Sequence, residues 1–199
     1  MTNPLYPSLY QINTRVWLTE RSRTLGHAAT LDDISDAELD RIAGMGFDWV
    51  WFLSVWRTGS AGQQISRSNA EWRKEFEDTL PDLRDEDIAG SGFAITGYTV
   101  GPALGGDAAL ARLRARLSKR GLKLMFDFVP NHTALDHPWV EEHPEYYVAG
   151  TEADLARGHR AETARGRRAG EVPLTNVGLY FGVVSLAPKY FARNRSTRL

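Results

Sequence analysis

Cysteine is absent from the 199-residue chain, and this absence removes several kinds of chemistry at once. Disulfide bonds, thiolate nucleophiles and cysteine metal sites all need a residue that the sequence lacks. Net charge is also nearly absent, at −1, so no overall field would draw the chain to nucleic acid or to an anionic membrane. No apolar run approaches the roughly 18 residues of a membrane-spanning helix.

Two kinds of sequence signal are missing as well. The first residues, MTNPLYPSLY, have neither the basic start nor the long apolar stretch of a secretory signal peptide, so we expect a cytoplasmic protein. No G-x-G-x-x-G or G-x-x-x-x-G-K segment follows an apolar run, which disfavours nucleotide-binding folds. The hydrophobic content of 42% and the charged content of 25% are those of an ordinary globular protein.

The most informative stretch begins with an apolar run over residues 122–129 that contains a single acid, Asp127. Pro130 ends the run, because proline has no N–H for a sheet, and Asn131 and His132 follow at once. Such a run predicts a strand buried on both faces, as in parallel sheets. A buried carboxylate needs a cationic partner or several hydrogen bonds. An acid at the carboxyl end of a parallel strand lies where α/β barrels place their chemistry, although it can also serve only to fix a turn.

The residues before this stretch predict a β-α-β unit. Residues 9–18 are rich in strand formers and predict a first strand. Ser35 and Glu38 have the spacing of a capping box, which predicts a helix that runs to about Ala43. Residues 48–53 then predict a second buried strand. A β-α-β unit requires a right-handed crossover and a parallel sheet.

Residues 54–105 form an insertion far longer than the usual strand-to-helix loop of about 2–6 residues. We expect a helix in it, capped by Ser68, with an apolar stripe that packing explains better than binding: Trp72, Phe76 and Leu80. A further helix, capped by Asp107, leads into the third strand. The order β-α-β-loop-α-β is typical of the opening of a (β/α) barrel or of a doubly wound sheet.

Two motifs together resemble the alpha-amylase family, glycoside hydrolase family 13. The D-x-x-x-N-H arrangement that starts at Asp127 resembles the first signature region of that family. The segment Gly92–Tyr98, GFAITGY, resembles the family's G-Y-x-x-x-x-Y pattern, with Phe93 in place of the tyrosine that stacks on the sugar. A phenyl ring keeps the apolar platform but loses the hydroxyl group. The likeness runs from about Leu9 to Tyr147.

The resemblance implies roles for individual residues. In the family the aspartate helps to position the catalytic arginine, and the histidine hydrogen-bonds the sugar at the cleavage subsite; these roles fall on Asp127 and His132. Phe93 and Tyr98 complete the implied substrate-binding or supporting set. Asn131 takes the position that backs a metal or second-domain region, which implies a calcium site. No other cofactor is expected, and the implied substrate is an α-glucan or α-glucoside.

The resemblance also implies an organisation for the chain. Residues 1–130 would be the N-terminal part of a (β/α)8 or TIM barrel, with its first three strands. Residues 131–150 would begin the domain that protrudes after the third strand. Residues 151–199 are basic and rich in small residues, which predicts an irregular tail. Their arginine run has no interleaved aromatic residues, so we expect neither nucleic-acid nor membrane binding.

The catalytic pair of the family has no counterpart in the sequence. Retaining glycosidases need a nucleophile and an acid/base carboxyl group about 5–5.5 Å apart. In the family these follow the fourth and fifth strands, and nothing after Asp127 matches the G-x-R-x-D-like nucleophile segment. The expectation is a glycoside hydrolase or glucanotransferase present as a truncated chain, inactive alone, whose partner would be a missing C-terminal half.

Two alternatives stay open at this point. The chain could be a non-catalytic remnant that binds carbohydrate or a partner. It could instead be a metal-dependent α/β enzyme, since carboxylate and imidazole groups suit divalent cations and six of them crowd one segment: Asp136, His137, Glu141, Glu142, His143 and Glu145. Their spacing matches no compact metal motif, which favours a solvated loop.

Overall fold

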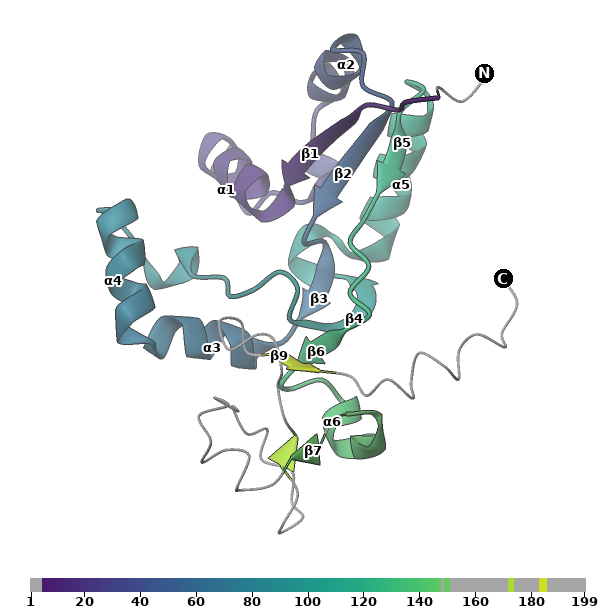
Figure 1. Ribbon diagram of the computed structural model, residues 1–199. Helices are drawn as coiled ribbons and strands as arrows, with labels where there is room; N and C mark the ends of the chain where they lie inside the picture. The colour runs from purple at the N-terminus through teal and green to yellow at the C-terminus, as the bar shows by residue number, and fades with distance from the viewer. Residues whose placement is uncertain (1–4, 148, 151–171, 174–182, 186–199) are drawn as a thin grey trace. The chain divides into compact units, whose positions relative to one another are not determined.

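A computed structural model describes most of the chain as two units (Figure 1). The described residues are 5–147, 149–150, 172–173 and 183–185. The first unit comprises Met1–Arg57 and Tyr98–Phe128, and the second comprises Thr58–Gly97 and Val129–Leu199. No helix in the described ranges is both long enough and apolar enough to cross a bilayer.

The first unit is built on a parallel sheet of three strands, β1 (Leu9–Asn13), β2 (Trp49–Leu53) and β5 (Lys123–Met125). Their order is β1-β2-β5, and both neighbouring pairs are parallel. This confirms the predicted pairing of the second and third strands. The third strand is shorter than the sequence indicates, however, because its sheet pairing ends at Met125. Asp127 therefore lies just beyond the carboxyl end of β5.

The first strand is also shorter than predicted, because the helix α1 (Thr14–Leu25) begins inside the expected strand 9–18. The side chain of Asn13 accepts a hydrogen bond from the backbone N–H of Val16 at 3.3 Å, which caps the helix. Gly26 ends it with a positive φ of 75°, a conformation that glycine adopts without steric cost. The strand formers after Asn13 are thus overridden by a helix cap.

The predicted crossover helix is present as α2 (Asp36–Gly44), which follows the short 3-10 turn η1 (Leu31–Asp33). Ser35 is its N-cap as expected, since its hydroxyl accepts the backbone N–H of Glu38 at 3.3 Å. The Glu38 carboxylate in turn accepts the hydroxyl hydrogen of Ser35 at 3.3 Å. The predicted N-cap therefore holds for the start of α2, but Glu38 binds the hydroxyl of Ser35 and not its backbone N–H, so only half of the predicted capping box is formed.

The helix before β5 is α5 (Gly106–Ser118), but Asp107 does not cap it. The N-cap is Gly105, whose φ of 96° places it in the left-handed region. Asp107 lies in the first turn of the helix, where its Oδ1 accepts the backbone N–H of Val100 at 2.8 Å. The carboxylate thus connects α5 to the preceding strand β4 (Ile95–Val100).

The core of the first unit lies between one face of the sheet and the helices α1, α2 and α5. Side chains from these elements form one buried cluster that includes Ile12, Val50, Phe52, Leu18, Leu39, Ile42, Leu113 and Leu117. The alternation of side chains along each strand sends Val50 and Phe52 to this covered face. The core is therefore that of a sheet layer packed under helices.

The opposite face of the same sheet is open. Leu9 is 41% exposed and Met125 is 37% exposed, while Trp49 and Trp51 are half-buried. The prediction that the third strand is buried on both faces is therefore wrong for the described residues. In a closed barrel the inward face of each strand is covered by strands across the barrel, and three parallel strands alone cannot supply that cover.

Arginines and aspartates spaced four residues apart join α5 to the α2 region. Residues four apart lie on one face of a helix, so Arg112 and Arg116 share a face of α5. Asp36 and Asp40 likewise share a face of α2, while Asp32 lies in η1 and Arg120 lies just beyond α5. The resulting ion pairs are Arg112–Asp32 at 2.6 Å, Arg116–Asp36 at 3.0 Å and Arg120–Asp40 at 2.6 Å. Hydrogen bonds from Arg112 and from Arg116 lower the pKa values of Asp32 and Asp36, respectively.

The second unit contains short elements. Its helices and 3-10 turns are α3 (Ser60–Ser68), α4 (Ala70–Thr79), η2 (Asp85–Asp87), α6 (Trp139–Glu142) and η4 (Pro144–Tyr146). Its strands form two antiparallel pairs, β6 (His132–Ala134) with β9 (Val183–Ser185) and β7 (Ala149–Gly150) with β8 (Val172–Pro173). The strands β3 (Trp56–Thr58) and β4 form a separate two-stranded sheet. The 3-10 turn η3 (Pro102–Leu104) follows β4 in the sequence.

The helix predicted within residues 54–105 is capped by a different residue. Asn69, not Ser68, begins α4, and its side chain accepts the backbone N–H of Trp72 at 3.0 Å. Asparagine is at least as good an N-cap as serine, so the neighbouring residue takes the position. No residue of α4 is buried, and Leu80 at the end of the predicted stripe is 36% exposed.

The expected division of the chain at residues 130 and 150 stays a prediction. The basic segment 151–199 lies outside the described residues apart from β8 and β9. Its predicted irregular structure is therefore also untested.

Candidate functional site

Asp127 is buried, with an exposed fraction of 8%, and its carboxylate binds the end of β2 and the residue that follows it. Oδ1 accepts the indole N–H of Trp51 at 2.9 Å, and Oδ2 accepts the backbone N–H of Ser54 at 2.7 Å. The backbone carbonyl of Asp127 accepts the indole N–H of Trp56 at 2.8 Å. The burial of this acid is thus compensated by several hydrogen bonds, which was one of the two solutions expected from the sequence.

The backbone at Ser54 explains part of this arrangement. Ser54 follows β2 directly and has a φ of 66°, a conformation that is uncommon for a residue with a side chain. The bond from its N–H to Asp127 fixes the chain as it leaves the sheet. Asp127 therefore fixes a turn, which is the structural role that the sequence left open. This turn lies at the carboxyl edge of the sheet, where barrels place their catalytic residues.

Tyr98 belongs to an aromatic cluster in the same unit. Its ring stacks on Phe128 with centroids 6.1 Å apart, and it forms a T-shaped pair with Trp56 with centroids 5.4 Å apart. Trp56 in turn contacts Phe126 at 5.3 Å. Tyr98 is 47% exposed and Phe128 is 78% exposed, so the cluster has an open aromatic surface.

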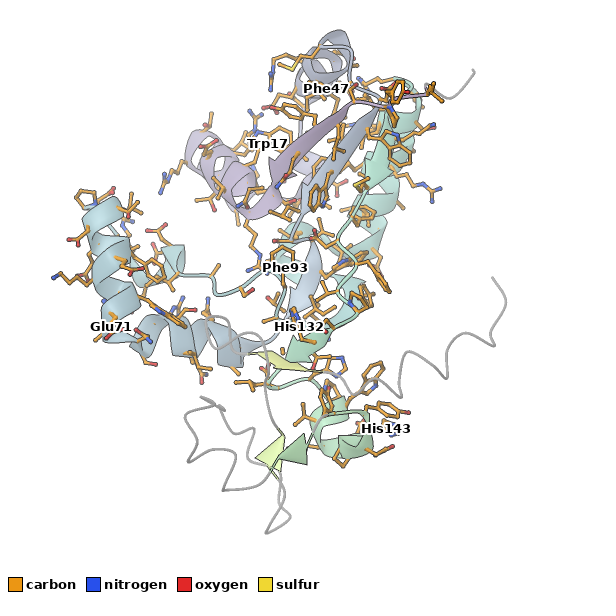
Figure 2. All side chains as sticks on the ribbon, in the orientation of Figure 1. Trp17, Phe47, Glu71, Phe93, His132 and His143 are labelled. Carbon is orange, nitrogen blue, oxygen red and sulfur yellow. The ribbon has the colours of Figure 1, made fainter. Side chains whose placement is uncertain are left out.

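Phe93 and His132 come together in the second unit, where Figure 2 labels both side chains. A backbone hydrogen bond of Phe93 acts on the imidazole of His132 and raises its pKa, but burial of the ring has the larger effect and lowers the pKa below its usual value. A bond that raises the pKa stabilises the protonated ring, and both nitrogens of a protonated ring are hydrogen-bond donors. The acceptor is therefore the backbone carbonyl of Phe93. Phe93 is 38% exposed, so part of this aromatic residue is open to solvent in the segment whose backbone contacts the imidazole.

The resemblance places a calcium site at Asn131, and the described residues do not fit one. The side chain of Asn131 is exposed. No group of three or more histidine, aspartate or glutamate side chains able to hold a metal ion occurs within the described ranges, although calcium prefers six to eight oxygen ligands. Calcium binding at Asn131 stays a prediction, and no step below uses a metal.

Two residues of the acidic and histidine-rich segment, Asp136 and His137, make hydrogen bonds to backbone N–H groups. Asp136 Oδ2 accepts the backbone N–H groups of Ser60 at 2.7 Å and of Ala61 at 3.2 Å, at the start of α3. His137 is 8% exposed, and its Nδ1 accepts the backbone N–H of Trp139 at 3.1 Å. Asp136 is exposed and lies in a turn, as expected for a solvated loop, although its carboxylate is bonded. The expectation is wrong at His137, which is buried.

The sequence did not point to the residues that hold these groups. Trp51, Ser54 and Trp56 are more than seventy positions from Asp127, and no local pattern connects them. The one available signal was the predicted edge of the sheet, because residues that follow neighbouring parallel strands meet there. The site residues thus fall into two groups, Asp127 with Tyr98 in the first unit and Phe93 with His132 in the second.

Comparisons with known proteins agree with this geometry. The family model for the alpha-amylase catalytic domain matches residues 21–173. A maltosyltransferase of Arcanobacterium haemolyticum, named for α-1,4-glucan and maltose 1-phosphate, is 32% identical over 135 residues, which cover 68% of this chain and 18% of that protein. An alpha-glucosidase of Apis mellifera is 34% identical over 100 residues, which cover 46% of this chain and 16% of that protein.

Solved structures show the same fold at low sequence identity. An alpha-amylase from Lactobacillus plantarum has a TM-score of 0.56 and 20% identity, and the match covers 95% of this chain and 33% of that one. The alpha-glucosyl transfer enzyme XgtA has a TM-score of 0.53 and 20% identity, with coverage of 90% and 30%. The chain thus spans about a third of the length of these structures or less.

The parallel β1-β2-β5 sheet under its helices agrees with the first strands of a TIM barrel, and the family model covers more than half of the sequence. The chain belongs to the alpha-amylase family.

Proposed function

We propose that the chain supplies an α-glucan-contacting part of an enzyme that cleaves or transfers α-glucosidic bonds. The contact between Phe93 and His132 carries the proposal. The partly exposed ring of Phe93 can accept the apolar face of a sugar. His132 uses one ring nitrogen as a donor to the Phe93 carbonyl, so in the neutral ring the other nitrogen is an acceptor suited to a sugar hydroxyl.

The substrate class follows from the relatives. The maltosyltransferase is named for an α-1,4-glucan and the second relative is an alpha-glucosidase, and both names refer to α-linked glucose. We therefore propose short α-1,4-linked glucose oligomers as the ligand of the Phe93–His132 pair. These relatives support the substrate class and leave the choice between hydrolysis and transfer to experiment.

Catalysis would need carboxylates other than Asp127 and Asp136. Asp127 is occupied as an acceptor for Trp51 and Ser54, and Asp136 for the start of α3. A retaining mechanism needs two carboxyl groups about 5–5.5 Å apart that can reach the glycosidic bond. We propose that further polypeptide supplies this pair and that these 199 residues bind sugar without cleaving it.

Isothermal titration calorimetry with maltoheptaose tests the proposal. We expect the wild-type chain to bind the sugar, and Phe93→Ala and His132→Gln each to weaken binding by about tenfold, since each removes one contact. Tyr6→Ala is the matched control, because Tyr6 is an aromatic residue that is 87% exposed and belongs to neither motif. Equal affinities for all four proteins would remove the pair from the binding site.

The alternatives differ in what they require. The metal-dependent enzyme loses support, because in the described residues no cluster of three side chains is able to hold a metal ion. The non-catalytic remnant shares the sugar contact and differs only in having no catalytic half to complete it. The cytoplasmic location expected from the sequence stays a prediction, which fractionation of the native cells would test.

A further inference from the structure

The helix α3 is capped by a residue that lies far away in the sequence. Its N-cap position is Gly59, which has no side chain to accept the free N–H groups of the first turn. Asp136, 76 residues after Ser60, takes this role: its Oδ2 accepts the N–H of Ser60 at 2.7 Å, the hydroxyl of Ser60 at 3.2 Å and the N–H of Ala61 at 3.2 Å. A carboxylate is well placed there, because the amino end of a helix is electropositive.

Gly59 leaves the space that this carboxylate occupies. A Cβ atom added to Gly59 would lie 1.7 Å from Oδ1 of Asp136, far inside any allowed contact. The φ of Gly59 is −80°, so its backbone alone does not demand glycine. The requirement for glycine at this position therefore comes from the carboxylate of Asp136.

The same segments carry the two residues proposed to contact sugar. The N–H of Gly59 donates to the carbonyl of Ala94 at 3.1 Å, and Ala94 directly follows Phe93. Ala94 packs against Ala134 in a small buried cluster, in which they are 1% and 0% exposed. Ala134 lies midway between His132 and Asp136 in the sequence.

Four contacts connect the segment that carries Phe93, the segment that carries His132 and the start of α3. One link is the bond between the backbone of Phe93 and the imidazole of His132, a second is the Ala94–Ala134 contact, and a third is the Gly59–Ala94 bond. The fourth link is the pair of bonds from the N–H groups of Ser60 and Ala61 to Asp136, which joins the start of α3 to the segment that carries His132. Removal of this link frees the segment that carries His132 from the start of α3.

We propose that Asp136, seated over Gly59, is a positioning residue that holds the imidazole of His132 against the backbone of Phe93. The sugar-binding consequence rests on the proposed function, whereas the positioning itself is a property of the chain alone. A contact that is fixed before the ligand arrives costs less conformational entropy when the ligand binds. Asp136 thus raises affinity for the sugar without touching it.

Three substitutions test the positioning role, two at Asp136 and one at Gly59. Asp136→Ala removes the carboxylate, and Gly59→Ala keeps it but takes its space. Asp136→Asn keeps the size of the side chain and one acceptor, so its effect should be smaller, and it remains informative if Asp136→Ala does not fold. Gly44→Ala is the matched control, because a Cβ there meets no atom within 4 Å.

The measurement is an NMR study of the full-length chain labelled at histidine and phenylalanine. In the wild type and in Gly44→Ala we expect nuclear Overhauser contacts between the His132 ring and Phe93. Asp136→Ala and Gly59→Ala should lose these contacts and weaken maltoheptaose binding by roughly fivefold, because the pair is no longer held in place before the sugar binds. An effect on overall stability alone would leave the His132 contacts of the folded molecules in place.

The outcomes separate this inference from the proposed function. Retention of the His132–Phe93 contacts in both Asp136→Ala and Gly59→Ala overturns the positioning role, whatever the sugar does. Loss of the contacts in both variants, with a wild type that does not bind maltoheptaose, supports the positioning role and contradicts the sugar-binding function. Loss of the contacts together with weaker binding supports both.

Discussion

At the scale of single residues, the carboxylate of Asp127 joins the end of β2 to the segment after β5. Its two oxygens accept N–H groups from Trp51 and from Ser54. Because the carboxylate is buried, its loss leaves two donors without an acceptor inside the fold. We therefore expect Asp127→Ala to lower the free energy of unfolding by about 2–4 kcal/mol, measured by urea denaturation.

Asp82→Ala is the control for this substitution, because Asp82 is exposed and lies in a loop. We expect it to change the free energy of unfolding by no more than about 0.5 kcal/mol, as is usual for surface positions. A similar loss for Asp127→Ala and Asp82→Ala would show that the buried hydrogen bonds contribute nothing specific.

Histidine titration gives a second prediction at this scale. Burial lowers the pKa values of His132 and of His137 from the ordinary value of 6.5. Below that pH the unfolded chain therefore binds protons more readily than the folded chain, so stability is greatest above 6.5 and falls as the pH drops through the lowered folded-state values. The pKa values of the arginine-paired Asp32 and Asp36 are lowered from their ordinary value of 3.8, so the stability that they contribute is lost only as the pH falls below that value.

The check is a series of urea denaturation curves between pH 7.5 and pH 5. The wild type should lose stability across this range, and the double variant His132→Gln/His137→Gln should lose less. A double variant with the same slope as the wild type would mean that other groups carry the pH dependence.

The sequence predicts some of these residues and not others. Asp127, Phe93 and His132 stand in motifs that a family resemblance picks out, so they could be named before the structure. The partners Trp51 and Ser54 and the Gly59–Asp136 contact join positions far apart in the chain. No local pattern records such pairs, because they arise only when the strands and helices have packed.

At the scale of elements, the ion pairs between α5 and the α2 region provide a third prediction. Arg120 pairs with Asp40 at 2.6 Å and with Asp36 at 3.0 Å. We expect Arg120→Ala to lower the urea midpoint in dilute buffer, and the difference from the wild type to shrink in about 1 M NaCl, where the Debye length is about 3 Å. Arg114→Ala, which removes an exposed arginine from α5 itself, is the comparison, and we expect its midpoint to change little at either salt concentration.

A difference that persists at high salt would show that Arg120 acts through packing of its stem rather than through charge. The spacing of four in both series was visible in the sequence. What the sequence could not show is that the two series face each other, since 80 positions separate each arginine from its partner.

The elements themselves were predicted where their signals were local and strong. The capping residue Ser35 placed α2, and the apolar runs placed β2 and β5 in a parallel sheet. The helix α1 was missed, because strand-forming residues around Asn13 hid a helix cap. Ser68 and Asp107 were wrongly expected to be caps because a neighbouring residue, Asn69 or Gly105, occupies each N-cap position.

At the scale of the whole molecule, the open face of the β1-β2-β5 sheet makes the fourth prediction. Leu9 and Met125 are 41% and 37% exposed on this face, and exposed apolar surface on a sheet favours association. We expect the purified chain to associate at micromolar concentration in light scattering. The double variant Leu9→Lys/Met125→Lys should reduce association, and Leu25→Lys, at a site that is also 41% exposed but at the end of α1, should not.

A monodisperse monomer at high concentration would contradict the association prediction. Association that is unchanged in Leu9→Lys/Met125→Lys would instead move the contact to another surface. In either case the open face would not be the surface through which the chain associates.

The most direct test of the account is one time-resolved NMR experiment on the purified chain with maltoheptaose. The anomeric signals of the sugar report cleavage or transfer, and the signals of Phe93 and His132 report binding in the same sample. We predict shifts at Phe93 and His132 and no new reducing ends or transfer products, because Asp127 and Asp136 are held as hydrogen-bond acceptors. Steady turnover that Asp127→Ala abolishes, or a spectrum in which neither Phe93 nor His132 responds to the sugar, would contradict it.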